Sequence, residues 1–275
     1  MKSTHELFEL SMWGGAVERR YRKLRPEVEA LPWDSLDLRQ ASRTALLTAR
    51  ATWTEAAFQE HRTGAACAAT LQALIAARAP IDMVAMASRF TLDEMVHVEL
   101  CARLAQAFGG GAPISYDPKN LIVMPATELS PGLAATELVV RNFCVGEALS
   151  IPLLRGSWHA ARVPLVKAIL GRIVKDEAAH GAFGWMFLEW IEDELSADDH
   201  VHLAKQAALV IDEIVARWAT LPASDDQSDE QRLGWMESKS YVALARRSMQ
   251  KAVLEPLIER GIDPRPWLTR SLGGS

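Results

Sequence analysis

The chain has 275 residues, of which 49 % are hydrophobic and 24 % are charged, a composition typical of a globular protein with a substantial core. Disorder, collagen-like repeats and small disulfide scaffolds are excluded. Thirty basic residues stand against 35 acidic ones, for a net charge of −5, and no Lys- or Arg-rich run is present, so nucleic-acid binding is not expected.

The three cysteines form no CxxC pair, which excludes a zinc ribbon and a rubredoxin-type iron site and fits a reducing compartment. The first residues do not build the apolar run of a signal peptide, and no stretch approaches the roughly 18 uncharged apolar residues of a membrane span. We therefore expect a soluble cytoplasmic protein without a membrane contact.

Apolar residues recur at intervals of three and four along almost the whole chain, which predicts an all-α fold without sheet. An amphipathic stretch covers residues 3–30. A long helix then extends from the cap candidates Asp34 and Ser35 to about Ala79, and a second helix covers residues 81–108.

The next segment, residues 109–129, is rich in Gly, Pro and Asn and lacks helical periodicity, so it predicts a long irregular connection. A third helix begins at Pro131 and is expected to kink at Pro152. A fourth begins at Pro164 and ends near Leu195. Two helices joined by a tight turn, a long crossover and a second such pair form the layout of a four-helix bundle.

Beyond this bundle, Ser196 and Asp199 have the spacing of a capping box and predict a fifth helix that ends near Thr220. A Ser- and Asp-rich loop at residues 224–229 precedes a sixth helix, which stops at Gly261.

The 13 prolines and 16 glycines form no cluster that resembles a flexible linker, which favours a single domain over residues 1–275. Its core bundle would cover about residues 36–195. The N-terminal segment 1–35 and the helices of residues 196–275 would pack outside it.

One five-residue motif occurs twice, as DEMVH at 93–97 in the second predicted helix and as DEAAH at 176–180 in the fourth. A Glu and a His three residues apart lie on one face of a helix, so both can reach the same metal centre inside a bundle. With 21 Glu and 7 His in the chain, chance placement yields about half of one such pair. Two copies, each preceded by Asp, indicate a site.

With this doubled motif, the chain resembles the ferritin-like di-iron carboxylate proteins over about residues 40–195. Their bundles carry a Glu on the first and third core helices and ExxH on the second and fourth. On this chain Glu60 and Glu147 fit those two positions, because antiparallel packing brings each level with the motif on the neighbouring helix. Glu137 fits less well than Glu147, and Glu55 would lie more than one turn too far away.

The resemblance implies a centre of two metal ions with six ligands, Glu60, Glu94, His97, Glu147, Glu177 and His180. Glu60 and His97 would serve one metal, Glu147 and His180 the other, and Glu94 and Glu177 would bridge. Carboxylate and imidazole ligands suit iron or manganese, so two iron ions are expected, with a mixed Mn/Fe centre left open. The alternative is a solvated charge pattern on a metal-free bundle.

Further residues are candidates for a supporting role around these ligands. Asp93 and Asp176 would each accept the far ring N–H of a ligating His and fix its tautomer, unless they are ordinary surface charges. Small and apolar residues at helical spacing from the ligands are candidates for a pocket lining: Gly64, Cys67, Phe90, Cys101, Phe143, Cys144, Ser150, Ile151, Phe183 and Gly184. Close helix contact for the glycines and plain core packing for the aromatics are the alternatives.

The resemblance implies an O2-dependent non-haem di-iron oxygenase or oxidase that acts on a small, largely apolar organic substrate, with no catalytic group beyond the metal centre. No flavin or nicotinamide motif is present, so a separate ferredoxin or reductase would supply electrons. The alternative is an iron-handling or peroxide-scavenging ferritin-like protein without an organic substrate. A homodimer fits both, and the substrate and reaction subtype stay open.

Overall fold

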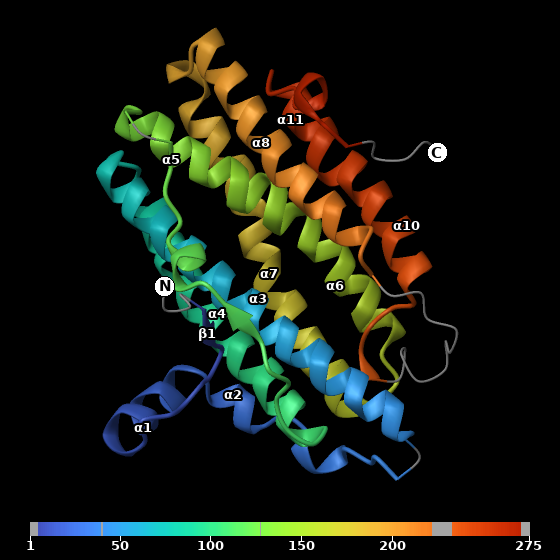
Figure 1. Cartoon of the computed structure of the whole chain (residues 1–275). Coiled ribbons are helices and arrows are strands. Elements are labelled where there is room, and N and C mark those ends of the chain that lie inside the picture. The colour runs from blue at the N-terminus through green and yellow to red at the C-terminus, as the bar shows by residue number, and fades with distance from the viewer. Residues whose placement is uncertain (1–4, 40, 127, 222–232, 271–275) are drawn as a thin grey trace.

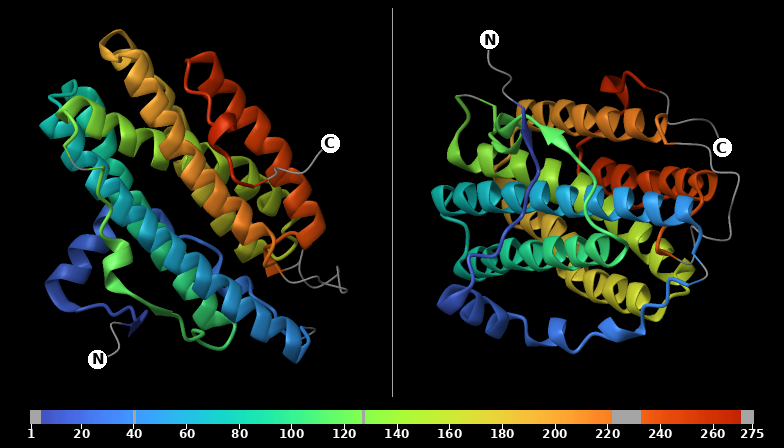
Figure 2. Two further views of the ribbon diagram at one scale, coloured as in Figure 1. Left: turned by 45° about the horizontal axis from the view of Figure 1, so that its top comes forward. Right: turned by 60° about the horizontal axis from the view of Figure 1, so that its bottom comes forward.

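The computed structural model describes residues 5–39, 41–126, 128–221 and 233–270, and this part of the chain is predominantly helical, as predicted. Figure 1 shows long helices at the centre, the N-terminal helices on one side and the C-terminal helices on the other. The turned views of Figure 2 show the same arrangement. Among the described helices, none combines the length and the apolar character that crossing a bilayer requires.

The first pair of long helices is α3 (Arg43–Ala76) and α4 (Ile81–Ala107), which pack along each other. The predicted start of α3 near Asp34 and Ser35 is wrong, because these residues lie in a single 3₁₀ turn, Trp33–Ser35. After this turn the Asp37 carboxylate accepts the backbone N–H of Arg39, a local bond that competes with a helix. The helix begins only where the Ser42 hydroxyl accepts the N–H of Ala45.

The connection from α4 to the second pair is irregular, as predicted, except for one short piece of sheet. The predicted absence of sheet is wrong here, since β1 (Glu6–Leu7) pairs antiparallel with β2 (Ser115–Tyr116). The chain leaves α4 through Gly109 and Gly110, whose φ angles of 113° and 112° favour glycine.

The second pair consists of a long composite helix and α7 (Pro164–Ile191). The composite helix begins after the Ser130 cap as α5 (Pro131–Val139), passes through a π-helical segment (Val140–Glu147) and continues as α6 (Ala148–Ala160), which contains Pro152. A π-helical turn carries more residues than an α-helical turn and so changes which side chains face the interior. Glu147 is the last residue of this segment.

The C-terminal helices cover the composite helix. The predicted capping box of Ser196 and Asp199 is present at the start of α8 (Ala197–Trp218), which packs on α5 and the π-helical segment. The helical run that packs on α6 consists of α10 (Ser238–Ser248), a second π-helical segment (Met249–Leu254) and α11 (Glu255–Glu259). The predicted loop at 224–229 lies outside the described residues.

At the N-terminus, α1 (Gly15–Leu24) and α2 (Pro26–Glu29) lie on the opposite side of the long helices (Figure 1). No residue of α1 is buried, whereas Val28 of α2 is fully buried. This segment therefore contacts the rest of the protein mainly through the end of α1 and through α2.

A buried carboxylate joins the crossover to the second helix pair. Glu137 of α5 accepts the backbone N–H of Ala126, at 3.2 Å, a bond from Arg141 Nη1, at 2.9 Å, and a bond from His202 Nε2 of α8, at 2.8 Å. The side chain is almost completely buried, and breaking such a network leaves the remaining groups without partners.

We predict that Glu137→Ala lowers the free energy of unfolding by about 1–3 kcal/mol, because it removes the buried acceptor shared by the Ala126 backbone N–H, Arg141 and His202, of which Arg141 keeps only its bond to the Met124 carbonyl. Glu55→Ala is the control, because Glu55 is exposed and pairs only with Gln59 among the described contacts; it should change stability by about 0.5 kcal/mol or less. Urea denaturation measures both. Equal effects of the two substitutions would contradict the structural role of Glu137.

Candidate metal centre

The six predicted ligands come from four helical elements and meet in the interior of the protein. They form two groups, in each of which one ligand atom per residue lies within 4.8 Å of every other. The two groups are Glu60, Glu94, His97 and Glu177, and Glu94, Glu147, Glu177 and His180. Glu94 and Glu177 belong to both groups.

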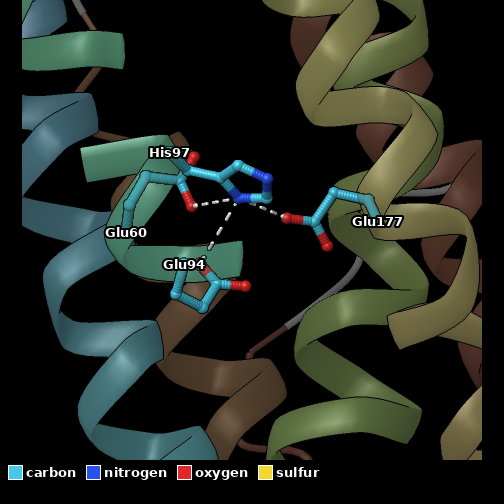
Figure 3. A group of neighbouring side chains, drawn as sticks. All are labelled: Glu60, Glu94, His97 and Glu177. Atoms are coloured by element: carbon cyan, nitrogen blue, oxygen red, sulfur yellow. Dashed lines mark ion pairs between the residues drawn. The ribbon is translucent and has the colours of Figure 1, made fainter. Parts of the chain in front are cut away.

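These two shared carboxylates each extend one oxygen toward each histidine. Glu94 Oε2 lies 3.7 Å from His97 Nδ1, and Glu94 Oε1 lies 3.1 Å from His180 Nδ1. Glu177 Oε1 lies 3.2 Å from His97 Nδ1, and Glu177 Oε2 lies 3.1 Å from His180 Nδ1. Figure 3 shows the first group, with the His97 ring facing the carboxylates of Glu60, Glu94 and Glu177. Glu94 and Glu177 therefore lie between the two histidines and belong to both groups that could hold a metal ion.

The structure places Glu60 rather than Glu55, and Glu147 rather than Glu137, at the cluster. Glu60 lies 3.8 Å from His97 and Glu147 lies in the group of His180, whereas Glu137 joins the crossover to α8 and Glu55 pairs with Gln59. The composite helix thus carries two buried glutamates, of which only Glu147 reaches this cluster.

Several polar atoms of the cluster are buried without a hydrogen-bond partner in the described part of the protein. They include both carboxylate oxygens of Glu94, Oε2 of Glu177 and the Nδ1 atoms of His97 and His180. Buried polar atoms are normally paired, and unpaired buried charges are costly. Four carboxylates and two imidazole nitrogens that converge in this way fit two divalent metal ions, whose charge nearly balances that of the carboxylates.

Burial and proximity shift the pKa values of the cluster strongly. Burial raises the pKa of Glu60 to about 8 and holds that of Glu147 well above its ordinary range. Burial opposes the charged form of His180, but the surrounding carboxylates Asp93, Glu177 and Glu94 raise its pKa to about 12. The metal-free cluster therefore keeps several protons at neutral pH.

We predict that binding of Mn²⁺ to the metal-free protein at pH 7 releases protons, because ligand carboxylates and imidazoles must be deprotonated. With the pKa of Glu60 at about 8, affinity should fall as the pH drops from 8 to 6, by about tenfold per pH unit for each proton released. Calorimetry in buffers of different ionisation enthalpy measures this release. A binding enthalpy that is independent of the buffer would contradict the prediction.

The aspartates of the doubled motif contact the far sides of the histidine rings in a crossed pattern. Asp176 Oδ2 lies 3.3 Å from His97 Nε2, and Asp93 Oδ2 lies 3.7 Å from His180 Nε2. Each Asp therefore faces the histidine of the other motif, on the other helix. The sequence indicated that each Asp could face a histidine, but not which one.

An arginine stands behind each of these aspartates, and the sequence analysis missed both. Arg89 Nε donates to Asp93 at 2.7 Å, and Arg172 Nε donates to Asp176 at 2.6 Å. Each Arg precedes its Asp by four residues, one helical turn. The repeat is therefore RxxxDExxH, at 89–97 and 172–180, and comparison of the two copies upstream of the Asp would have revealed it.

Three predicted pocket residues form an aromatic cluster beside one histidine. Phe90 lies 4.3 Å from His180 between ring centroids, and Phe143 and Phe183 lie 5.6 and 5.3 Å from Phe90. Phe143 and Phe183 are also in contact, at 5.1 Å. These three aromatic rings form an apolar surface next to His180.

The remaining polar and sulfur-containing candidates lie around the cluster. Ser150 Oγ donates to Glu147 Oε2 at 3.2 Å. Burial raises the pKa of Cys67 and Cys101, and the nearby carboxylates add to this, so both thiols stay protonated. Cys144 is buried against Gly184.

The glycines among the candidates allow close helix contact. A Cβ at Gly64 would meet the terminal methyl of Met95, and the candidate Ile151 packs against Gly181, a glycine outside the candidate set. A Cβ at Gly184 would lie 2.8 Å from Cys144 Sγ, 3.0 Å from Phe143 Cβ and 3.1 Å from the Cys144 backbone nitrogen. For Gly64 and Gly184 these contacts favour close helix packing over the lining of a pocket.

We predict that Gly184→Ala destabilises the protein by about 1–3 kcal/mol, because the new methyl group meets backbone and Cβ atoms that cannot move independently. Gly64→Ala is the control and should cost less, since its nearest contact is the end of the flexible Met95 side chain and the Glu94 Cβ lies farther away, at 3.3 Å, than the fixed atoms around Gly184. Thermal unfolding compares the two variants. A Gly64→Ala loss equal to that of Gly184→Ala would contradict this account.

A scan against protein-family models and searches of curated proteins and of solved structures find no match to the chain. The established finding is a helical protein with a buried Glu/His cluster that could bind a metal ion. Any assignment of function therefore depends on the geometry of this cluster and on the resemblance carried by the doubled motif.

Proposed function

We propose that the chain is a non-haem di-iron oxidoreductase with a ferritin-like bundle, which uses O2 to oxidise a small, largely apolar organic molecule. The observation that carries this proposal is the position of Glu94 and Glu177. Each carboxylate has one oxygen within 3.7 Å of His97 Nδ1 and the other within 3.1 Å of His180 Nδ1. A site for one ion would not need both carboxylates to face both histidines.

In this proposal Glu60 and His97 hold one iron, Glu147 and His180 hold the other, and Glu94 and Glu177 bridge. The same donor set would accept a mixed Mn/Fe pair. Two bound iron ions would supply electrons to O2 and so make oxidation of an unactivated substrate accessible. Since the chain carries no flavin or nicotinamide motif, a separate ferredoxin or reductase would return the electrons.

The chain's own side chains would position the ligands and the substrate. Ser150 donates to Glu147 and so restrains one terminal carboxylate. Phe90, Phe143 and Phe183 would exclude water from the His180 side and contact the apolar part of a substrate. Five of the six ligands are buried and Glu60 is 16 % exposed, which supports chemistry in a site largely shielded from water.

We predict that the wild-type protein, reconstituted anaerobically with Fe²⁺, binds two irons per chain. Glu94→Ala should lose both, because Glu94 faces both histidines, whereas Glu60→Ala should lose one, because Glu60 belongs to a single group. Glu55→Ala is the control on the same helix as Glu60 and should bind two. Elemental analysis measures the iron, and circular dichroism checks that each variant is helical.

The reduced, iron-loaded protein should then consume O2, measured with an oxygen electrode, and apolar organic compounds should increase the rate. Failure of the wild-type chain to bind stoichiometric metal would contradict the proposal, and the cluster would then be a buried charge network without metal. Uptake of iron far beyond two per chain would instead support the iron-handling alternative.

A further inference from the structure

The two histidines of the Glu/His cluster differ in the contacts that their Nε2 atoms make. His97 Nε2 is hydrogen-bonded to Asp176 at 3.3 Å, whereas His180 Nε2 lies 3.7 Å from Asp93 and has no hydrogen-bond partner within the described residues. The ring of His97 is thus fixed on its far side by a closer contact than the ring of His180. The two copies of the motif are identical in spacing, so the difference arises outside the motif.

The difference continues at the two arginines behind the aspartates. The Arg89 side chain is 59 % exposed and pairs with Asp93. The Arg172 side chain is only 11 % exposed and bonds both Asp176 and Glu27, a residue of the N-terminal helix α2. A hydrogen-bonded chain therefore runs from Glu27 through Arg172 and Asp176 to His97.

The N-terminal segment that supplies Glu27 is anchored on α4 on both sides of His97. Arg25 is fully buried, and its Nη2 atom donates to Glu99 at 2.6 Å. The Tyr21 hydroxyl donates to the backbone carbonyl of Met95 at 3.3 Å. Both contacts hold residues 21–29 (the N-terminal clamp) next to the helical turn that carries His97.

Glu27 affects the Asp176–His97 hydrogen bond through the guanidinium between them. A guanidinium shared by two carboxylates withdraws less charge from each, so Asp176 remains the stronger acceptor for the His97 N–H while Glu27 is in place. Glu27 also restricts the side chain of Arg172, which fixes the position of Asp176. Such outer contacts commonly raise the metal affinity of the histidine that they orient.

We propose that the N-terminal clamp makes the two metal sites unequal, because Glu27 holds Asp176 against His97 through Arg172. The inference rests on the proposed two-metal centre. The site of Glu60 and His97 is then the tighter one, and the site of Glu147 and His180 is the weaker one. Glu27 and Arg172 are positioning residues, which touch no metal themselves.

The test is a titration of the metal-free full-length protein with Mn²⁺, with the free ion followed by electron paramagnetic resonance. Wild-type protein should show two classes of site. Glu27→Gln should weaken the tighter class about tenfold and leave the weaker class unchanged. Glu29→Gln is the matched control, because Glu29 lies two residues away with similar exposure and pairs with Arg22, Arg25 and Arg103 rather than with Arg172.

Double variants assign the effect to one site. In a Glu147→Ala background, which retains the His97 site, Glu27→Gln should still weaken Mn²⁺ binding about tenfold. In a Glu60→Ala background, which retains the His180 site, it should have no effect. Thermal unfolding of the metal-free variants shows whether a general loss of stability accompanies these changes.

Unchanged binding by Glu27→Gln, equal weakening of both sites, or equal effects of Glu27→Gln and Glu29→Gln would each overturn the clamp while leaving the two-metal centre in place. A wild-type chain that binds no Mn²⁺ and no Fe²⁺ would overturn the proposed function and the clamp together. The two failures are therefore distinguishable.

Discussion

The structure depends on one electrostatic constraint, which is that four carboxylates and two imidazoles are enclosed in a helical core. Burial makes the charged form of each carboxylate costly, and the pKa values of Glu60 and Glu147 are raised for this reason. Such a cluster is stable only if protons or cations neutralise it. In the metal-free protein protons have this role, and the convergence of Glu94 and Glu177 on both histidines makes a cluster that could instead be neutralised by bound metal.

The rest of the fold holds these groups at short range. The irregular crossover lets the second helix pair lie against the first, and the buried Glu137 fixes it to α5 and α8. The π-helical segment ends at Glu147 and places this carboxylate in the cluster. Close contact at Gly184 brings α7 against the composite helix and packs Phe143 beside the His180 half of the site.

Much of this organisation could be predicted from the sequence, because helical periodicity and the ExxH spacing are local properties. The boundaries at Pro131 and Pro164, the capping box at Ser196 and the irregular crossover follow from local backbone chemistry. The predicted start of α3 near Asp34 is wrong, because several residues upstream of Arg43 could cap a helix. Only the tertiary structure shows that Ser42 is the one that does. The short pairing of β1 with β2 joins segments too far apart in sequence to be inferred from either.

The sequence by itself determined that two helices each carry a Glu and a His on one face, since residues three apart lie on the same side of a helix with 3.6 residues per turn. Together with the family resemblance, which calls for a Glu on the first and third core helices, distances from the helix turns indicated Glu60 and Glu147. Only the tertiary structure decided that each Asp faces the histidine of the other motif and that Glu27 reaches Arg172. These contacts join residues from different helices, and their geometry depends on how the helices are rotated and packed, which no local pattern encodes.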